Sequence, residues 1–456
     1  MSMVDKHYPY DPKNKESIIS YARKLLGSTL RQHIAVSEMP NPRRRKGTFG
    51  NALEKDYFQY ELNNDSNPDF AEVGLELKAT PLKRNKNGKY VAKERLVITM
   101  INYLNVIRER FEASILMHKL KDILLVVYLY EKEKNFLDYQ IKIVDEWALP
   151  EEDVPTIKAD WELVVKKIRD GRAHEISGRD TLYLEACTKA SSSSVTTKQP
   201  FSDIPAKPRA WALKASYMTA VENKLLKKRK MEPIKVSKEE EGFNLLDVVR
   251  HRFQPYFGLT EEELGKKFGY ETAKGKKPKA LTALVTRQIL GVAEDAKIEQ
   301  FEKAGIKQKT IRLTKTGRPK EAVSFPRFDY YELVETDFED SDFYRQLQDK
   351  YLFVIYRESP EDPGVYRLAD VLFWQMPDSD LEYAARCYEE MRARTKAGHA
   401  ENSVKSTENP CCHVRPHARN KQDTLPTPPN GKPVIKKCFW LNQGYLAEEI
   451  HRNLNL

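Results

Sequence analysis

The chain has 456 residues, of which 40% are hydrophobic, and this length is enough for two folded domains of ordinary size. Its 77 Lys and Arg residues exceed its 67 Asp and Glu residues, and the net charge of +10 favours a polyanionic partner such as nucleic acid. No apolar run reaches the ~18 residues of a membrane helix and no secretory apolar segment opens the sequence, so we expect a cytoplasmic protein that does not enter a membrane. Five cysteines without a C-x-x-C pair argue against a disulfide framework.

The first predicted elements are two helices separated by a basic loop. Residues 14–30 carry apolar side chains at helical spacing and end near a glycine, which is a common helix stop. A basic run at residues 42–47 includes Lys46, and residues 48–58 resume a helical pattern that contains Glu54. A charged loop is most often solvated surface, but this one precedes a helix that carries a carboxylate. We therefore expect it to contact a phosphate or a DNA groove.

Residues 67–80 hold the pattern on which the predicted chemistry depends. Apolar and polar residues alternate from Leu75 to Thr80, which predicts a strand with Glu76 and Lys78 on one face. Asp69 comes just before this strand, and Asp69 and Glu76 with one phosphate oxygen would suffice to hold Mg²⁺. The metal would activate a water and neutralise charge on the phosphate, while Lys78 would position or deprotonate that water. The alternative is a half-buried strand with a solvated polar face.

The next elements are strands and a long helix. Residues 94–101 and 122–130 are rich in β-branched and aromatic residues and are predicted to be further strands of one mixed sheet. A basic group at residues 119–121 stands at the entry to the second of these strands and could reach the site. Residues 158–169 have the pattern of an amphipathic helix, and a strand is expected at residues 181–185.

Polar loops close the first half of the chain. They include Arg179, and the later segment 207–219 carries Arg209 and Lys214. Loops with Arg, Ser and Lys on a rigid sheet commonly read base edges in the major groove, so we expect these three residues to contact DNA.

The second half repeats the first in a degenerate form. Residues 301–310 echo residues 70–79, and two later segments echo the strand around Leu124 and the segment around Trp211. Gln300 and Lys307 stand where Asp69 and Glu76 stood. An amide and a cation cannot hold Mg²⁺, so this half should bind DNA, if at all, without cutting it. The alternative is a chance echo of common strand and helix patterns.

The two halves are separated by a segment that is dense in charge and weakly apolar, which predicts a linker. We therefore predict a catalytic domain over residues 1–223, a charged linker over 224–243, and a degenerate DNA-binding, allosteric domain over 244–456.

In their order and spacing, the residues of the first half resemble the MutH mismatch-repair nicking endonucleases and the restriction enzymes related to them. The likeness is carried by Lys46-Gly47, Leu53-Glu54, Asp69, the Gly-Leu-Glu-Leu-Lys of residues 74–78, the His-Lys-Leu-Lys of residues 118–121, Asp160-Trp161-Glu162 and Leu213-Lys214. The resemblance implies an α/β (α+β) PD-(D/E)xK restriction-endonuclease-like fold, Mg²⁺-dependent hydrolysis and a GATC target. The catalytic places fall by position on Glu54, Asp69, Glu76 and Lys78, with Lys121 as a supporting lysine, and the DNA-contacting places fall on Lys46 and Arg179.

The whole layout, a tandem repeat of an active and a degenerate MutH-like domain, resembles the two-domain GATC type II restriction endonucleases. This resemblance implies double-stranded DNA containing GATC as the partner, cleavage before the G with 5′ overhangs, and a second DNA site or dimerisation on DNA. Ala212 stands where the mismatch-repair enzymes have a DNA-contacting tyrosine, which leaves a variant target open. DNA contacts in the second domain are expected, by position, from Arg415, His417, Arg419, Asn442 and Gln443.

Two alternatives stay open from the sequence. One is a mismatch-repair-type GATC nicking endonuclease that works under a partner's control, against which the second domain argues. The other is a non-catalytic DNA-binding regulator, against which the retained carboxylates argue.

Overall fold

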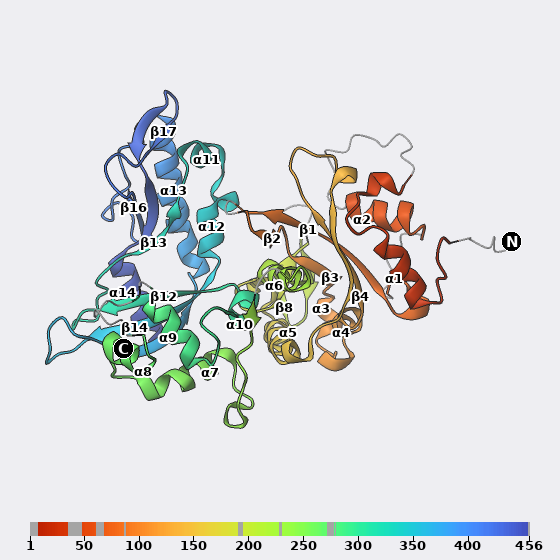
Figure 1. Ribbon diagram of the computed structural model, residues 1–456, viewed down its shortest axis with the longest axis horizontal. Helices are drawn as coiled ribbons and strands as arrows, with labels where there is room; N and C mark the ends of the chain where they lie inside the picture. The colour runs from red at the N-terminus through yellow and green to blue at the C-terminus, as the bar shows by residue number, and fades with distance from the viewer. Residues whose placement is uncertain are drawn as a thin grey trace. The chain divides into compact units, whose positions relative to one another are not determined.

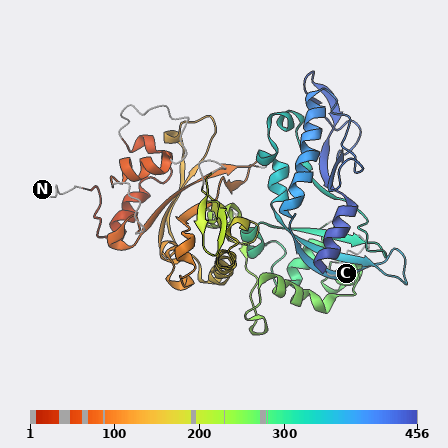
Figure 2. The same ribbon diagram turned by 180° about the vertical axis from the view of Figure 1, so that it is seen from behind.

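The computed structural model describes residues 8–34, 48–60, 68–85, 88–189, 195–227, 230–270, 278 and 280–454. Within these ranges no helix is both long and apolar enough to cross a bilayer. The chain divides into one unit of Met1–Met231 with Glu299–Gly305 and another of Glu232–Ile298 with Ile306–Leu456. Figures 1 and 2 show the elements of each unit from opposite sides.

The predicted linker contains ordered structure. It includes β10 (Met231–Glu232), which pairs with β11 (Lys297–Ile298), and a 3₁₀ turn at Lys238–Glu240. Glu240 is buried, and its carboxylate accepts a hydrogen bond of 2.6 Å from Arg252. The boundaries at 223 and 244 stay a prediction.

The first unit is built on a mixed sheet and a smaller antiparallel sheet. The mixed sheet has the order β2-β1-β4-β5, with β1 parallel to β4 and the other neighbours antiparallel. The second sheet has the order β3-β9-β6, and β7 and β8 form a hairpin. The strands are β1 (Glu76–Arg84), β2 (Tyr90–Ala92), β3 (Leu96–Met100), β4 (Ile123–Leu129), β5 (Ile141–Trp147), β6 (Leu184–Thr188), β7 (Thr197–Gln199), β8 (Ser202–Ala206) and β9 (Arg209–Leu213).

The prediction of one mixed sheet was wrong for β3. β2 takes the edge of β1, with Leu82 opposite Ala92. The chain then crosses to the second sheet, where Leu96 pairs with Leu213 of β9.

Helices complete the first unit. The predicted first helix is confirmed as α1, which Asn14 caps by accepting a hydrogen bond from the Ser17 amide. α1 and the apolar face of β1 and β4, including Leu75, Leu77 and Val126, form one core. The helices are α1 (Lys15–Arg23), α2 (Thr48–Ala52), α3 (Tyr103–Val106), α4 (Ile115–Leu120), α5 (Val154–Arg169), α6 (Ala215–Leu225) and α10 (Glu299–Ala304).

Although α10 comes from the second half of the sequence, it packs in the first unit against α6. Its Lys303 is 3% exposed, and the ammonium lies 2.6 Å from Asp153 and 2.8 Å from Glu299. Asp153 also accepts a hydrogen bond of 2.8 Å from the Tyr217 hydroxyl. A buried ion pair therefore fixes this segment.

The second unit repeats the two sheets. β12 is parallel to β14, β14 is antiparallel to β15, and a second sheet has the order β13-β19-β16 beside the hairpin of β17 and β18. Its strands are β12 (Ile306–Leu313), β13 (Val323–Arg327), β14 (Lys350–Glu358), β15 (Tyr366–Trp374), β16 (Cys412–Pro416), β17 (Thr424–Thr427), β18 (Lys432–Ile435) and β19 (Lys437–Leu441). Its helices are α7 (Leu245–Phe253), α8 (Glu261–Lys267), α9 (Leu281–Ile289), α11 (Tyr330–Glu335), α12 (Asp342–Leu347), α13 (Leu381–Lys396) and α14 (Gln443–Leu454).

The order of elements matches between the units, and so do details. α5 and α13 each have 16 residues and follow a 3₁₀ turn that a proline precedes, Pro150 or Pro377. The Tyr217–Asp153 hydrogen bond has its counterpart in Tyr445–Asp380, also 2.8 Å. The degenerate repeat expected from the sequence is therefore present in the fold.

Candidate active site

The predicted strand with two polar residues on one face is β1. Its first residue, Glu76, is 1% exposed, and its carboxylate accepts a hydrogen bond of 2.6 Å from the Lys78 ammonium. Leu75 and Leu77 point into the core on the opposite side. The alternation read from the sequence therefore places Glu76 and Lys78 together as expected.

A tight loop brings Asp69 onto this strand. The main chains of Phe70 and Leu75 exchange hydrogen bonds of 2.9 and 3.3 Å, and Gly74 between them has φ 68°, which glycine adopts without strain. The Asp69 carboxylate accepts a hydrogen bond of 2.8 Å from the Leu77 amide. Burial, and next the charge of Glu76, raise the pKa of Asp69 above its usual value.

Glu54 approaches the same site from a π-helical turn, Leu53–Tyr57, that continues α2. Such turns are rare and occur often at functional sites. Burial and then the charge of Asp69 raise the pKa of Glu54 to about 7, while Lys78 opposes the shift. The three predicted carboxylates therefore lie close enough to repel one another.

The second lysine that contacts Glu76 is Lys119, whereas the sequence favoured Lys121, two residues later. Lys119 is buried on α4, and its ammonium lies 3.0 and 3.1 Å from the two oxygens of Glu76. Lys121 lies exposed at the C-terminal cap of the same helix. Lys119 follows the buried Leu116 by three residues and so lies on the same face of α4. This spacing is visible in the sequence and could have indicated Lys119.

The donor set suits a divalent cation. Burial first, and the charge of a neighbouring carboxylate next, raise the pKa values of Asp69 and Glu54. Across the described part of the chain, no three His, Cys, Asp or Glu side chains lie close enough to hold a metal unaided. A hard cation that takes one or two carboxylates together with water and a substrate phosphate fits such a site.

Three predicted DNA contacts of the first unit lie around one loop, residues 176–181. Arg209 and Lys214 donate to main-chain oxygens at its two ends, Arg209 to Ile176 and Lys214 to Thr181 at 2.5 Å. Arg179 lies half-buried within the loop, where its amide donates to Ser177. Arg209 and Lys214 therefore hold the loop in place. Lys46 lies outside the described residues.

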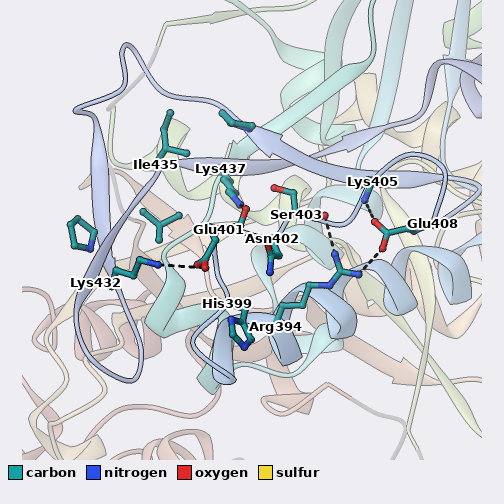
Figure 3. Close-up of a pocket in the computed structure, with 13 residues that line it drawn as sticks. Arg394, His399, Glu401, Asn402, Ser403, Lys405, Glu408, Lys432, Ile435 and Lys437 are labelled. Atoms are coloured by element: carbon teal, nitrogen blue, oxygen red, sulfur yellow. Dashed lines mark hydrogen bonds and ion pairs between the residues drawn. The ribbon is translucent and has the colours of Figure 1, made fainter.

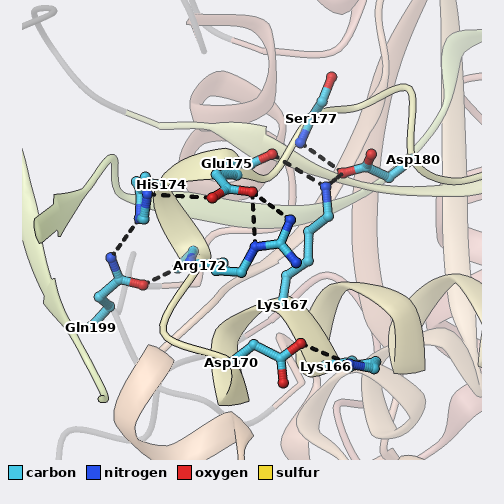
Figure 4. Close-up of polar contacts among 10 residues, drawn as sticks. Lys166, Lys167, Asp170, Arg172, His174, Glu175, Ser177, Asp180 and Gln199 are labelled. Carbon is cyan, nitrogen blue, oxygen red and sulfur yellow. Dashed lines mark hydrogen bonds and ion pairs between the residues drawn. The ribbon is translucent and has the colours of Figure 1, made fainter. Parts of the chain in front are cut away.

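Contacts at the end of α5 fix the start of this loop (Figure 4). Lys167 lies 2.7 Å from Asp180 and donates to the Glu175 oxygen at 3.3 Å. Gln199 of the β7–β8 hairpin is 6% exposed and accepts a hydrogen bond of 2.7 Å from the Ala173 amide. A loop anchored in this way can present a side chain to a groove with little loss of entropy.

The five residues expected to reach DNA in the second unit fall into two groups. Arg415 and Arg419 are exposed, and the Arg415 guanidinium lies 3.8 Å from the centre of the Trp440 ring. His417 is also exposed, and its Nδ1 lies 2.9 Å from the Cys438 sulfur.

The other two residues make contacts within the protein, and their contact with DNA stays a prediction. Asn442 is 7% exposed, contacts His413 at 2.6 Å and donates to the Asn409 oxygen at 2.7 Å. Gln443 donates to the Lys320 oxygen at 2.7 Å. A polar residue at a strand end can form hydrogen bonds with buried main-chain groups as readily as with a ligand, and the sequence does not distinguish the two cases.

A cavity of about 850 Å³ also lies in the second unit (Figure 3). Three of its cationic groups are bonded within the protein: Arg394 lies 2.7 Å from Glu408, Lys432 lies 3.4 Å from Glu401, and the buried Lys437 donates to the Ala400 main-chain oxygen at 2.7 Å.

The second unit has lysines where the first has its catalytic strand residues. In the strand register of the first unit, Glu76 of β1 lies opposite Ile123 of β4, which lies opposite Trp147 of β5. In the second unit, Lys307 of β12 lies opposite Tyr351 of β14, which lies opposite Trp374 of β15. Lys307 is ion-paired with Asp349. Burial and then the Lys307 charge lower the pKa of Lys309, two residues along. This site cannot hold a cation through the same strand.

Comparison with known proteins agrees with the repeat. The family model described as DNA mismatch repair enzyme MutH matches residues 58–160 and 290–385, one stretch in each half. The type II restriction enzyme Sau3AI of Staphylococcus aureus is 31% identical over 502 aligned positions, covering 96% of this chain and 98% of that protein. The DNA mismatch repair protein MutH of Shewanella woodyi is 28% identical, over 41% of this chain and 81% of that protein. The MutH protein of Shigella flexneri is 26% identical, over 46% of this chain and 92% of that protein.

Proposed function

The chain belongs to the MutH-like family of type II restriction endonucleases and is a site-specific deoxyribonuclease, and from this premise we propose that it cuts duplex DNA at GATC with Mg²⁺. The observation that carries the proposal is the convergence of Glu54, Asp69 and Glu76 with Lys78 at the start of β1. A catalytic domain over residues 1–223 and cleavage before the G, leaving 5′ overhangs, are part of the proposal.

Each residue of the cluster has a proposed task. Asp69 and Glu76 would hold the cation, which when bound supplies an activated water and neutralises charge on the phosphate. Lys78 would position or deprotonate the attacking water, and Glu54 would complete the acidic side of the site. Lys119, rather than Lys121, would hold Glu76 in place through its two contacts with that carboxylate.

For the second unit we propose DNA binding without cleavage, with a second GATC site acting as an allosteric effector. The lysines in place of the catalytic strand residues support the loss of cleavage. Exposed Arg415, His417 and Arg419 are the proposed contacts there. In the first unit, Lys46 and Arg179 are the proposed DNA contacts, and Arg209 and Lys214 support the loop that carries Arg179.

A plasmid digest tests the function. Fragments with GATC ends that form in Mg²⁺ and not in EDTA support the proposal, and a matched plasmid without GATC should stay intact. Nicked circles without linear product would favour the mismatch-repair-type reading, and binding without any strand break would favour a DNA-binding regulator. The Asp69→Asn variant is the control for a contaminating nuclease.

A further inference from the structure

The hydroxyl of Tyr60 is buried and has no hydrogen-bond partner within the described residues. A buried hydroxyl is normally paired, so an unpaired one needs an explanation such as a role that arises when another group binds. The aromatic ring alone does not explain it, since phenylalanine would fill the same space without a polar atom.

The local chain directs Tyr60 into the carboxylate cluster. Gln59 has φ 59°, a left-handed conformation that is costly for a residue with a side chain and that turns the chain inward after the π-helical turn. The Tyr60 amide then donates to the Glu54 main-chain oxygen at 3.3 Å. The Tyr60 ring meets Phe70 edge-on, with 5.4 Å between ring centres, and Phe70 directly follows Asp69.

The electrostatic neighbours of the phenol agree with this placement. After burial, the groups that raise the pKa of the phenol are Asp69, Glu54 and Glu76, in decreasing order, followed by Tyr10. Asp69 already accepts the Leu77 amide on one carboxylate oxygen, Oδ2. A second donor on this carboxylate would fix its plane.

We propose that Tyr60 is a positioning residue whose hydroxyl, when a divalent cation binds, donates to the Asp69 carboxylate and orients it toward that cation. This inference rests on the proposed function. Partners of this kind around metal ligands typically change metal affinity by about 10–100-fold when they are removed.

The test is Tyr60→Phe, with the Mn²⁺-induced rise in melting temperature as a readout that needs no cleavage. The concentration of Mn²⁺ at the midpoint of this rise should increase about tenfold. The Mg²⁺ concentration for half-maximal cleavage should increase similarly, while the rate at saturating Mg²⁺ stays within about threefold. The melting temperature without metal should be unchanged or higher, because the substitution removes an unpaired buried hydroxyl.

Tyr57→Phe is the matched control. Its hydroxyl, on the π-helical turn that carries Glu54, donates to the Tyr21 main-chain oxygen at 2.8 Å. Loss of this hydroxyl should therefore leave the Mn²⁺ midpoint unchanged. An unchanged midpoint in Tyr60→Phe, an equal shift in Tyr57→Phe, or a lower metal-free melting temperature or failure to fold in Tyr60→Phe would each overturn the inference. If the wild-type protein shows neither a Mn²⁺ response nor Mg²⁺-dependent cleavage, the proposed function has failed instead.

Discussion

Glu54→Gln should stabilise the metal-free protein while abolishing cleavage. In the folded protein the pKa of Glu54 is raised from 4.5 to about 7, so between these pH values the folded chain holds a proton that the unfolded chain has released. Stability therefore falls as pH rises through this window. At about 1.4 kcal/mol per pH unit the interval corresponds to about 3 kcal/mol. Because Glu54 is partly exposed, we halve the effect to about 1.5 kcal/mol.

The assay is calorimetric melting at two pH values. Glu54→Gln should melt about 4 °C above wild type at pH 8, and close to wild type at pH 4.5, where the wild-type carboxyl is already neutral in the fold. Saturating Mg²⁺ should erase the gain, because a bound cation removes the repulsion in the wild-type site. An equal gain at both pH values, or none at pH 8, would refute the account of Glu54 as a carboxylate buried against Asp69.

Three further predictions concern the two units. Glu76→Ala should lower the melting temperature more than Asp69→Ala does, because it leaves the buried Lys119 unpaired at a cost of about 3 kcal/mol. Both variants should lose cleavage and keep most of their DNA affinity in gel shifts with Ca²⁺, and wild-type cleavage by either would contradict the site. Plasmids with two GATC sites should be cut faster than plasmids with one at low protein concentration, and equal rates count against an allosteric second unit. Asn442→Ala should lower the free energy of unfolding in denaturant by about 1–3 kcal/mol with little change in DNA affinity. Arg415→Ala should instead weaken DNA binding and reduce its salt dependence, and the reverse pattern would support Asn442 as a DNA contact.

The catalytic strand was predictable because its chemistry follows from local periodicity. Alternation around Glu76 and Lys78 sets their common face whatever the rest of the chain does. Asp69 precedes the strand so closely that a single tight loop brings it back. Lys119, and not the predicted Lys121, contacts Glu76, because residues two positions apart on a helix face different ways and burial of Leu116 and Leu120 sets which face turns inward.

Other features depend on contacts that are distant in sequence. The separation of β3 from the main sheet follows from β2 taking the edge of β1, which no pattern within residues 94–101 reveals. The burial of Asn442 depends on His413 and Asn409, about thirty residues earlier. The π-helical turn that carries Glu54 reads as an ordinary helix in sequence, because one extra residue in a turn leaves the apolar pattern almost intact.

The placement of α10 makes the first unit discontinuous in the sequence. A fragment truncated near residue 231 would retain Asp153 but lack Lys303, and it would leave the face of α6 that packs against α10 uncovered. Expressing this fragment alone thus yields a different molecule from the first unit within the full chain. The segment that carries Asp69 in the first copy corresponds in the second copy to α10, which packs in the first unit. Truncating the chain at one position therefore cannot separate the two units intact.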